Sequence, residues 1–600
     1  MLVTLLAVCG LATAALAQGS QADAPVGVAV VMVAVGQGDG LLVKAPDGTV
    51  HVVDAGPNGQ GTAVMLPAIA ALQPSGYGFT FMSHFHIDHM GGLDEVLNAL
   101  PFQFAYDRGD VNRPSNGDVT NYLNAAGARR QLITLGAVYQ LGGGATIRCI
   151  AYNGNVVGGA SVNPVGTAQE ENSRSVVLKL EYGQFAMWFG GDLTGGASST
   201  ADVETPASLA CGDVDVYKCN HHGSNTSTSL NLIANLQPEL AVVSCGQGNS
   251  FGHPTSQTVN RINQAVAARI LLSTTTGSAS TIGFGVTGTL RIDSDGRRYR
   301  ATAANGDFLD FFCDEVSTPV LAAGDVRVSE VHRNPAFVPD TNGEYVEVVN
   351  IGSKPVGLRG LRLSDNAATV TLASNFMAVP GRPLLFQVDA APTRNGGLPL
   401  GVPLPFGSVA LADTADNATL QAGAATTVDS VTWASGWPGG SGIACERVDL
   451  FGSQISGNWA PAPNPFGVGD RGSPGRGNDG DSTVHQVQIG VSTAADRFTL
   501  HGTALDHGNL LSVLLLAYAN TPGTPFANAV IPLAFDSLFA ASLGAPGFIA
   551  LMPLPGYRSV DVVLPQPNPV AGIPLFAAHV VLDFALTVPG LSGAISFVLP

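Results

Sequence analysis

The sequence predicts an α/β domain at the N-terminal end of the chain, followed by two β-rich segments. Strand and helix patterns alternate from Val26 to about Val316, and after that point short apolar runs separated by Gly, Pro and Asn replace the helical periodicity. The chain has 600 residues, more than the about 250–300 residues that one hydrophobic core supports, so several domains are expected. Hydrophobic residues make up 45% and charged residues 12%, a composition that favours large cores and excludes a disordered chain.

The predicted elements of the first domain follow from periodicity and turn residues. Short β-type runs are separated by Gly-Gln-Gly-Asp and Pro-Asp-Gly turns, and apolar residues later recur at helical spacing. The predicted strands are Val28 to Val33, Gly40 to Lys44, Thr49 to Val53 and Phe79 to Met82, with helices over Ala63 to Leu72 and around Leu93, Val96, Leu97 and Leu100. Hairpins are predicted at Ser175 to Leu180 with Phe185 to Phe189, and at Leu290 to Arg300 with a turn at Asp295-Gly296.

The remaining chain predicts two further units. Val326 to Val331, Tyr345 to Asn350, Gly360 to Leu363 and Thr369 to Leu372 have the rhythm of a β-sandwich. Ser456 to Asp481 is rich in Pro, Gly and Asn and predicts a tail and linker. Val484 to Pro600 predicts a C-terminal β-rich domain whose role the sequence does not indicate.

The first residues predict export from the cell. Met1 to Ala17 form an apolar run that ends in a small-residue pattern before Gln18, which is typical of a signal peptide although a basic start is missing. A membrane anchor is the alternative, but the run is short for a span. The protein is therefore expected to be secreted or on the cell surface, where the six cysteines after the run permit disulfides. The net charge of −18 counts against tight, nonspecific binding of nucleic acid.

A histidine-rich cluster predicts a metal site. His84 and His86 are two apart in an extended segment, so their side chains share one face, and Asp88 and His89 lie in the turn that follows. Imidazoles with a carboxylate suit zinc. Asp192, which ends an apolar strand after two glycines, is predicted to bridge two cations.

Asp54 also follows a buried strand. Its predicted role is to orient a ligand or the nucleophilic water. The alternative for both Asp54 and Asp192 is an ordinary turn residue.

Together these motifs resemble the metallo-β-lactamase superfamily, and in particular the soluble hydrolase domain of competence proteins involved in DNA uptake. The resemblance covers about Val26 to Val316 and rests on Val35 to Asp39, Val53 to Gly56, Ser83 to Leu93, Gly190 to Asp192, His221 to Ser224 and Gly252 to Pro254. It implies a four-layer αββα sandwich with two metal ions, expected to be zinc, with manganese as the alternative. It further implies that His84 and His86 hold the first ion, Asp88 and His89 the second, and that Asp192 bridges them.

One departure from that family affects the ligand set. The superfamily usually has a histidine between the cluster and Asp192, but this chain has none between His89 and His221 and carries Glu170-Glu171-Asn172-Ser173 in that stretch. His221 or His222 is the candidate replacement ligand, and His222 is favoured. His253 is the candidate last ligand of the second ion, with an ordinary loop histidine as the alternative.

The predicted chemistry is hydrolysis by a metal-bound hydroxide, with Asp88, Asp54 and His222 as the catalytic residues. Ser224, Asn225 and Thr226 are weaker candidates for contact with the substrate or its phosphate, because such a run is also an ordinary helix cap or turn. A phosphodiester is the favoured substrate. Another ester, a lactone or a β-lactam is the first alternative, and a cell-surface binding protein with a degenerate metal site is the second.

The second unit has a resemblance of its own. Its strand series, with Asn334-Pro335 and the ending Gly472 to Asn478, resembles the lamin-tail domain, an immunoglobulin-like β-sandwich, over about Asp325 to Asn478. That resemblance implies an interaction module with an extracellular or cell-surface partner. The sequence indicates neither its ligand nor the oligomeric state.

Overall fold

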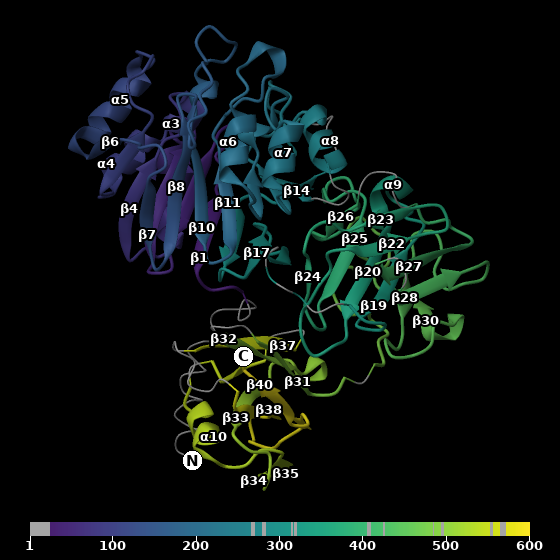
Figure 1. Cartoon of the computed structure of the whole chain (residues 1–600). Helices are drawn as coiled ribbons and strands as arrows, with labels where there is room; N and C mark the ends of the chain where they lie inside the picture. Colours follow the sequence, from purple (N-terminus) through teal and green to yellow (C-terminus); the bar gives the residue numbers. More distant parts are fainter. Residues whose placement is uncertain are drawn as a thin grey trace.

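The computed structural model describes most of the chain in three regions that follow one another in sequence (Figure 1). The described residues are 24–265, 270–278, 284–313, 316, 318, 321–404, 410–423, 426–483, 485–493, 497–545, 547–552, 556–564 and 572–599. The predicted signal peptide, Met1 to Ala17, lies outside them. Within these ranges no helix is both long and apolar enough to span a bilayer.

Two nine-stranded sheets form the middle of the first region. The first sheet has the order β18-β17-β16-β1-β2-β3-β4-β5-β6, and the second has β15-β14-β13-β12-β11-β10-β8-β7, with β9 paired to β8. The strands of the first sheet are β1 (Val28–Met32), β2 (Gly40–Lys44), β3 (Thr49–Ala55), β4 (Gly76–Phe81), β5 (Phe104–Asp107), β6 (Arg130–Leu132), β16 (Leu290–Ser294), β17 (Arg298–Thr302) and β18 (Phe308–Phe312). Those of the second are β7 (Val138–Gly142), β8 (Ala145–Tyr152), β9 (Asn155–Val156), β10 (Val177–Tyr182), β11 (Phe185–Phe189), β12 (Val216–Lys218), β13 (Leu240–Val243), β14 (Ile270–Ser273) and β15 (Gly285–Val286).

Helices cover the outer face of each sheet, which completes four layers (Figure 1). On the first sheet lie η1 (Gly61–Met65), α2 (Leu66–Ala71), α3 (Ile87–Met90), α4 (Leu93–Ala99) and α5 (Gly117–Ala126), which η2 (Gly127–Arg129) follows. On the second lie α6 (Glu204–Cys211), α7 (Leu230–Leu236) and α8 (Ser256–Ala265). Three short 3-10 turns, η3 (Asn172–Arg174), η4 (Ala197–Ser199) and η5 (Asn220–Gly223), connect elements of the second half. The predicted four-layer sandwich is therefore present.

Side chains alternate between the two faces of a strand, and this explains how one strand packs against two different cores. Val28, Val30 and Met32 of β1 belong to the core between the sheets, whereas Val31 belongs to the core beneath the helices. Because successive side chains of a strand point to opposite faces, a strand covered on both sides must be apolar throughout. All five residues of β1 and of β11 are buried, as this arrangement requires.

The second region consists of β-sheets that share a core with the first. A six-stranded sheet, β26-β25-β20-β19-β29-β30, and a four-stranded sheet, β23-β22-β27-β28, contribute to one buried cluster, and β21 pairs with β24. The elements are β19 (Val326–His332), α9 (Asp340–Gly343), β20 (Tyr345–Asn350), β21 (Val356–Gly357), β22 (Leu361–Ser364), β23 (Thr369–Thr371), β24 (Met377–Ala378), β25 (Pro383–Gln387), β26 (Val402–Pro403), β27 (Asp416–Ala422), β28 (Thr426–Trp433), β29 (Cys445–Arg447), η6 (Ser456–Asn458) and β30 (Trp459–Pro461). The lamin-tail identity of this region stays a prediction.

The linker prediction for Ser456 to Asp481 is wrong. β30 pairs with β29 in the six-stranded sheet, and Ser473 is fully buried, with its backbone N–H and hydroxyl donating to Glu330. A Pro- and Gly-rich segment folds in this way when buried partners satisfy its backbone groups, which composition alone does not reveal.

The first two regions are joined by polar and apolar contacts. Phe311 forms an isolated bridge with Phe376, and Arg382 Nη1 donates to Asp310 Oδ2 at 2.8 Å. On another side, Arg359 Nη2 donates to Glu239 Oε1 at 2.5 Å. Buried residues from both regions form one continuous core cluster.

The C-terminal region is β-rich, as predicted. It holds the sheets β31-β32-β37 and β36-β33-β38-β39, with β40 paired to β38, and the pair β34-β35. The elements are β31 (Gln488–Thr493), β32 (Arg497–Thr503), η7 (Leu505–His507), β33 (Leu511–Ala517), β34 (Thr524–Phe526), β35 (Ala529–Ile531), α10 (Ser537–Ser542), β36 (Ile549–Leu551), β37 (Tyr557–Val563), β38 (Pro574–Leu582), β39 (Gly590–Leu591) and β40 (Ile595–Val598). Across the chain, Cys149, Cys211, Cys219, Cys245 and Cys445 are buried and form no disulfide with another described residue.

Candidate metal centre

The predicted histidine cluster lies where two parallel strands end. β3 and β4 are parallel neighbours, so Asp54 near the end of β3 and Ser83 just after β4 reach the same edge of the sheet. Ser83 donates to Asp54 through its backbone N–H (2.7 Å to Oδ1) and its hydroxyl (2.6 Å to Oδ2). The chain then turns through His84 and His86 into α3, which carries Asp88 and His89. Local structure therefore presents the whole motif at one edge.

Asp54 fixes the orientation of His89. His89 Nδ1 donates to Asp54 Oδ2 at 2.8 Å, and both side chains are buried. With its proton on Nδ1, a neutral His89 presents the lone pair of Nε2 to the interior of the site. This contact corresponds to the ligand-orienting role expected of Asp54.

Asp192 lies between two groups of imidazoles. Its Oδ1 is 3.1 Å from His89 Nε2 and 3.4 Å from His222 Nε2, while its Oδ2 is 3.9 Å from His84 Nε2 and 3.7 Å from His221 Nε2. Gly191 allows this position, because its φ is +51° and a Cβ there would lie 2.5 Å from Ser83 Cβ. One carboxylate thus directs one oxygen to each group.

The Nε2 atoms of His89 and His222 face each other, and this contact requires either a metal ion between the two nitrogens or a proton on one of them. Their Nε2 atoms are 3.2 Å apart, and the Nδ1 atom of His222 is 3.0 Å from the carbonyl oxygen of Ser244. Because each Nδ1 has an acceptor, both neutral rings would direct lone pairs at each other and at Asp192 Oδ1. A metal ion or added protons must relieve that repulsion. Ligand atoms of a tetrahedral zinc lie about 3.3 Å apart when the bonds are about 2.0–2.1 Å, which matches the separations here.

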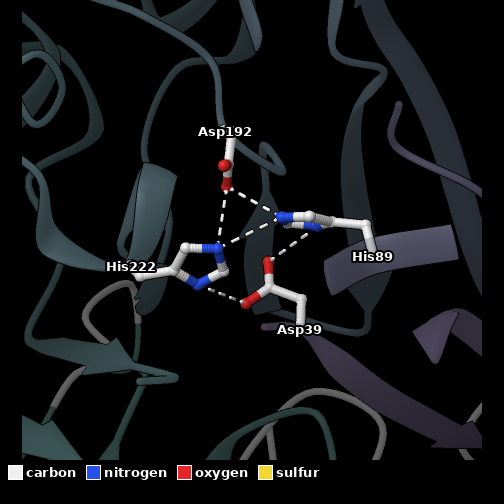
Figure 2. Close-up of side chains that lie close together, drawn as sticks. All are labelled: Asp39, His89, Asp192 and His222. Carbon is white, nitrogen blue, oxygen red and sulfur yellow. Dashed lines mark hydrogen bonds and ion pairs between the residues drawn. The ribbon is translucent and has the colours of Figure 1, made fainter. Parts of the chain in front are cut away.

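Asp88 and Asp39 approach this pair from different sides. Asp88 Oδ2 is 3.3 Å from His222 Nε2, the nitrogen that also faces Asp192. Asp39 Oδ1 instead lies 3.4 Å from His222 Nδ1, and its Oδ2 lies 3.6 Å from His89 Nδ1. Figure 2 shows Asp39 and Asp192 on opposite sides of the two rings. Asp39 is therefore placed to orient the imidazoles, although its oxygens are also close enough to hold an ion with His89, Asp192 and His222.

Lys218 neutralises Asp39. The Lys218 ammonium is fully buried, forms an ion pair with Asp39 Oδ2, and donates to the carbonyl oxygen of Gly191 at 3.2 Å. Burial lowers the pKa of Lys218, but Asp39 and then Asp192 outweigh burial and raise it above its ordinary value. The charge left uncompensated in the centre is negative, since Lys218 stands against four carboxylates: Asp39, Asp54, Asp88 and Asp192.

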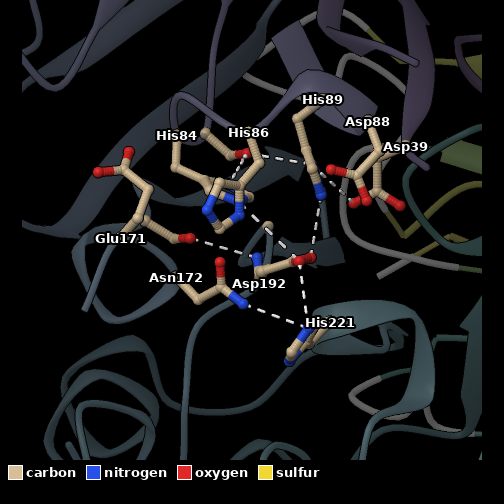
Figure 3. A network of polar contacts seen from close by, with 12 residues as sticks. Asp39, His84, His86, Asp88, His89, Glu171, Asn172, Asp192 and His221 are labelled. Atoms are coloured by element: carbon tan, nitrogen blue, oxygen red, sulfur yellow. Dashed lines mark hydrogen bonds and ion pairs between the residues drawn. The ribbon is translucent and has the colours of Figure 1, made fainter. Parts of the chain in front are cut away.

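The second group contains His84, His86 and Asp192, whose ligand atoms lie within 4.8 Å of one another. His84 Nε2 is 3.0 Å from His86 Nδ1. His221 approaches from the other side of Asp192 and has Asn172 Nδ2 3.2 Å from its Nε2 (Figure 3). The two groups together offer positions for two ions, joined by Asp192.

The negative charge of the centre raises the pKa values of two of its histidines, His89 and His222. Burial opposes the charged form of His222, but Asp192 and Asp39 outweigh it and raise its pKa to about 10. The pKa of His89 is raised well above its ordinary value, because Asp192 and Asp88 likewise outweigh burial. Burial, reinforced by His89 and His86, keeps the pKa of His84 well below its ordinary value. His89 and His222 therefore bind protons where no metal ion is present, and a metal ion must displace them.

Two of the predicted ligands lie elsewhere than expected. His222, predicted to complete the first ion's ligands with His84 and His86, lies with His89 and Asp88. His253 belongs to neither group among the described residues. Its ring stacks on Phe251 (centroids 5.7 Å apart) and on His222 (6.4 Å) and meets His221 edge-on (5.4 Å), and burial followed by the nearby His222 lowers its pKa to about 4.

The weaker substrate candidates surround His221. Thr226 Oγ1 is 2.9 Å from His221 Nδ1 and 2.9 Å from Ser224 Oγ, so these hydroxyls are engaged within the protein. Asn225 is exposed, and its carbonyl oxygen accepts a hydrogen bond from Arg261.

Asp39, Lys218 and Ser83 are parts of the centre that sequence reasoning missed. The sequence analysis places Asp39 in a turn. An aspartate directly after Gly-Gln-Gly and before a buried strand could have identified it as a candidate residue of the centre. Lys218 ends the buried strand β12, where an isolated lysine is unusual and indicates a buried partner.

Part of this chain is similar in sequence to known proteins. Residues 33–183 match the metallo-beta-lactamase superfamily. ComE operon protein 3 of Bacillus subtilis is 26% identical over 266 residues, which cover 42% of this chain and 32% of that protein. Competence protein ComA of Neisseria gonorrhoeae is 35% identical over 95 residues, or 16% of this chain and 13% of that protein.

The chain therefore spans a third or less of the length of these relatives. Among solved structures, Zn²⁺-bound PqqB from Methylobacterium extorquens is similar at 13% identity and a TM-score of 0.25, covering 40% of this chain and 95% of that one. Residues 33–183 of this chain are thus similar to the metallo-β-lactamase superfamily, and the region that contains them holds a candidate metal centre around Asp192.

Proposed function

We propose that this protein is a secreted, metal-dependent hydrolase that cleaves phosphodiesters, in nucleic acid or a related substrate. The observation that carries the metal-dependent part is the position of Asp192, whose two oxygens face two separate groups of imidazoles. Two groups of four and three residues, each counting the shared Asp192, fit a two-ion centre, zinc in the first instance and manganese as the alternative. Export is proposed from the apolar run of Met1 to Ala17.

Such ions, when bound, supply a hydroxide at neutral pH and polarise a phosphoryl oxygen. The residues of the chain have separate tasks around that chemistry. Asp54 holds His89 in the required tautomer, and Ser244 does the same for His222. Asp88 is the only carboxylate of the four that is partly exposed, so it is the group placed to accept a hydrogen bond from an attacking water.

An open hollow beside the centre, lined by Arg261 and also by Asp202, is where the proposal places the substrate phosphate. It has a volume of about 260 Å³, and Thr226, Ser227, Ser229 and Arg261 are among its lining residues. Thr226 links the cavity to the centre through His221. Arg261 Nη1 donates to the carbonyl oxygens of Asn225 and Ser227, an arrangement that holds the guanidinium beside the cavity, where guanidinium groups bind phosphate well.

The relatives support a nucleic-acid substrate. One of them is named a competence protein, and competence is the uptake of DNA. The net charge of −18 does not favour tight binding to a polyanion, so recognition is expected to depend on the centre and on Arg261 rather than on a basic surface.

The experiment is a hydrolysis assay on the full chain loaded with zinc or manganese. We expect turnover of bis-p-nitrophenyl phosphate and of DNA, but not of a chromogenic β-lactam. In Asp192→Ala we expect loss of metal and a fall in activity larger than the about 10–100-fold typical of residues behind the ligands, whereas Asp118→Ala, a remote carboxylate, stays at the wild-type level.

Each other outcome contradicts part of the proposal. Turnover of the lactam or of a simple ester, without turnover of phosphodiesters, would reject the substrate class. Less than one equivalent of zinc or manganese after gentle purification would reject the enzyme and favour a binding protein.

A further inference from the structure

The two candidate metal positions that share Asp192 differ in the ligand atoms that surround them. The first, which we call the dedicated position, has the Nε2 atoms of His89 and His222 and one oxygen each of Asp88 and Asp192, with neighbouring separations of 3.1–3.4 Å. The second, which we call the shared position, has His84, His86 and the other oxygen of Asp192. Its contact between His84 and Asp192 is longer, at 3.9 Å.

Only one side chain of the stretch from Glu170 to Ser173 is available to the shared position. Glu170 is paired with Arg174 at 2.8 Å. Glu171 is held by Arg108 at 2.6 Å and accepts from the backbone N–H of Phe85. Ser173 Oγ is 2.6 Å from Thr194 Oγ1.

Asn172 differs from these neighbours. Its side chain is 3% exposed, and its Oδ1 is buried without a hydrogen-bond partner among the described residues. An unpartnered carboxamide oxygen is unfavourable inside a protein, so its presence beside a cluster of metal ligands indicates a partner that arrives from outside the chain.

His221 lies next to this amide. Its Nδ1 is 2.9 Å from Thr226 Oγ1, and its Nε2 lies 3.2 Å from Asn172 Nδ2 and 3.7 Å from Asp192 Oδ2. The backbone at His221 is left-handed, with a φ of +52°. The side chain of His221 faces Asp192 Oδ2, whereas the side chain of its neighbour His222 faces Asp192 Oδ1. Asn172 and His221 therefore lie beside Asp192 Oδ2, the oxygen that also faces His84 of the shared position (Figure 3).

We propose that Asn172 completes the shared position with its carboxamide oxygen, held in place by His221, and that this position consequently binds its ion second and more weakly than the dedicated position. A neutral amide oxygen is a poorer ligand for zinc than an imidazole nitrogen and is better suited to harder ions such as manganese. The inference rests on the proposed function only in placing metal at this centre. It requires no particular substrate.

The test is calorimetric titration of the metal-free full chain with Zn²⁺, and separately with Co²⁺ while its visible absorption is recorded. For the wild type we expect two binding steps of different affinity. Asn172→His, which supplies an imidazole, should tighten the weaker step by about tenfold or more, and Asn172→Ala should weaken it by a similar factor. The stronger step should stay unchanged in both variants, and only the Co²⁺ spectrum of the second equivalent should differ.

Asn235→Ala, an amide on α7 away from the centre, is the matched control and should leave both steps unchanged. Thermal unfolding of each metal-free variant shows whether it is folded. His221→Gln should weaken only the second step, because it releases Asn172 while the dedicated ligands stay in place. The inference is overturned if the wild type binds two ions with equal affinity, or if the changes at Asn172 alter the stronger step or neither step.

These outcomes separate the inference from the proposed function. A chain with two unequal steps that cleaves no phosphodiester retains the inference and loses the function. A chain that cleaves phosphodiesters but has steps unaffected by Asn172 retains the function and loses the inference.

Discussion

Replacing Asp54 by asparagine changes a single oxygen of the centre and tests the orientation of His89. In the wild type, Asp54 Oδ2 accepts from His89 Nδ1 at 2.8 Å and from the Ser83 hydroxyl at 2.6 Å, while Oδ1 accepts from the Ser83 backbone at 2.7 Å. In Asp54→Asn the amide oxygen can keep the backbone bond, so the loop after β4 stays in place. The amide nitrogen then faces His89 Nδ1 as a donor, which forces the proton of a neutral His89 onto Nε2.

That tautomer removes one ligand of the dedicated position. Loss of such a partner behind a metal ligand typically lowers metal affinity by about 10–100-fold, which is about 1.4–2.7 kcal/mol. This range agrees with the about 1.5–3 kcal/mol that a charge-assisted hydrogen bond contributes. We expect the Kd of the stronger Zn²⁺ step to rise by that factor.

The assay is competition for Zn²⁺ with a chromogenic chelator, using Asp47→Asn in an exposed turn as the matched control. Thermal unfolding of the metal-free variant shows that the loop is intact. An affinity within about twofold of wild type in a folded Asp54→Asn protein would refute the reasoning, because His89 would then not depend on Asp54 for its tautomer.

Three further predictions follow from other charged or titratable groups. Lys218→Met leaves the buried Asp39 carboxylate with only His222 and His89 as charged neighbours and should lower the free energy of unfolding of the metal-free protein in chemical denaturation, by less than the about 3–5 kcal/mol of a fully broken buried ion pair, with Lys179→Met as the half-buried control; an unchanged value would contradict the ion pair. Arg261→Ala should raise KM for DNA severalfold while metal content and kcat stay near wild type, and Arg261→Lys should recover part of the loss; equal KM values would remove Arg261 from substrate binding. Burial raises the pKa of Glu330 to about 7 from its ordinary 4.5, and burial together with Glu330 raises the pKa of Glu347 well above its ordinary value, so the folded state binds extra protons and its stability is full below about pH 4.5 and falls as pH rises through 7. Thermal unfolding of wild type should show that decline between pH 5 and 8, and a variant with both Glu330→Gln and Glu347→Gln that shows the same decline would contradict it.

The sequence predicted those parts of the centre that are close together in the chain. His84, His86, Asp88 and His89 occupy one turn after a buried strand, so their convergence is a local property that spacing reveals. Asp192 was predicted because its glycines and its position after β11 mark the end of a buried strand. The layers of the first region were likewise accessible from alternating strand and helix patterns together with the family resemblance.

Contacts that depend on the pairing of elements far apart in the chain could not be predicted from the sequence. Asp39 and Lys218 meet only because the start of β2 and the end of β12, which belong to different sheets, lie at the same edge of the sandwich. His221 and His222 are adjacent in sequence, but left-handed backbone at both residues directs them to different groups. No sequence periodicity predicts such a pair of dihedral angles, so the sequence alone could not decide which of the two histidines is a metal ligand.

The continuous core between the first two regions limits how the protein can be divided. A truncated hydrolase that ends near Val316 would uncover Phe311 where Phe376 now covers it and would deprive Asp310 of Arg382. Such a fragment would present an apolar edge to water and tend to aggregate or to recruit other chains. Evolutionary exchange of the second region is restricted in the same way, because a replacement module would have to reproduce that edge before the enzyme could fold stably.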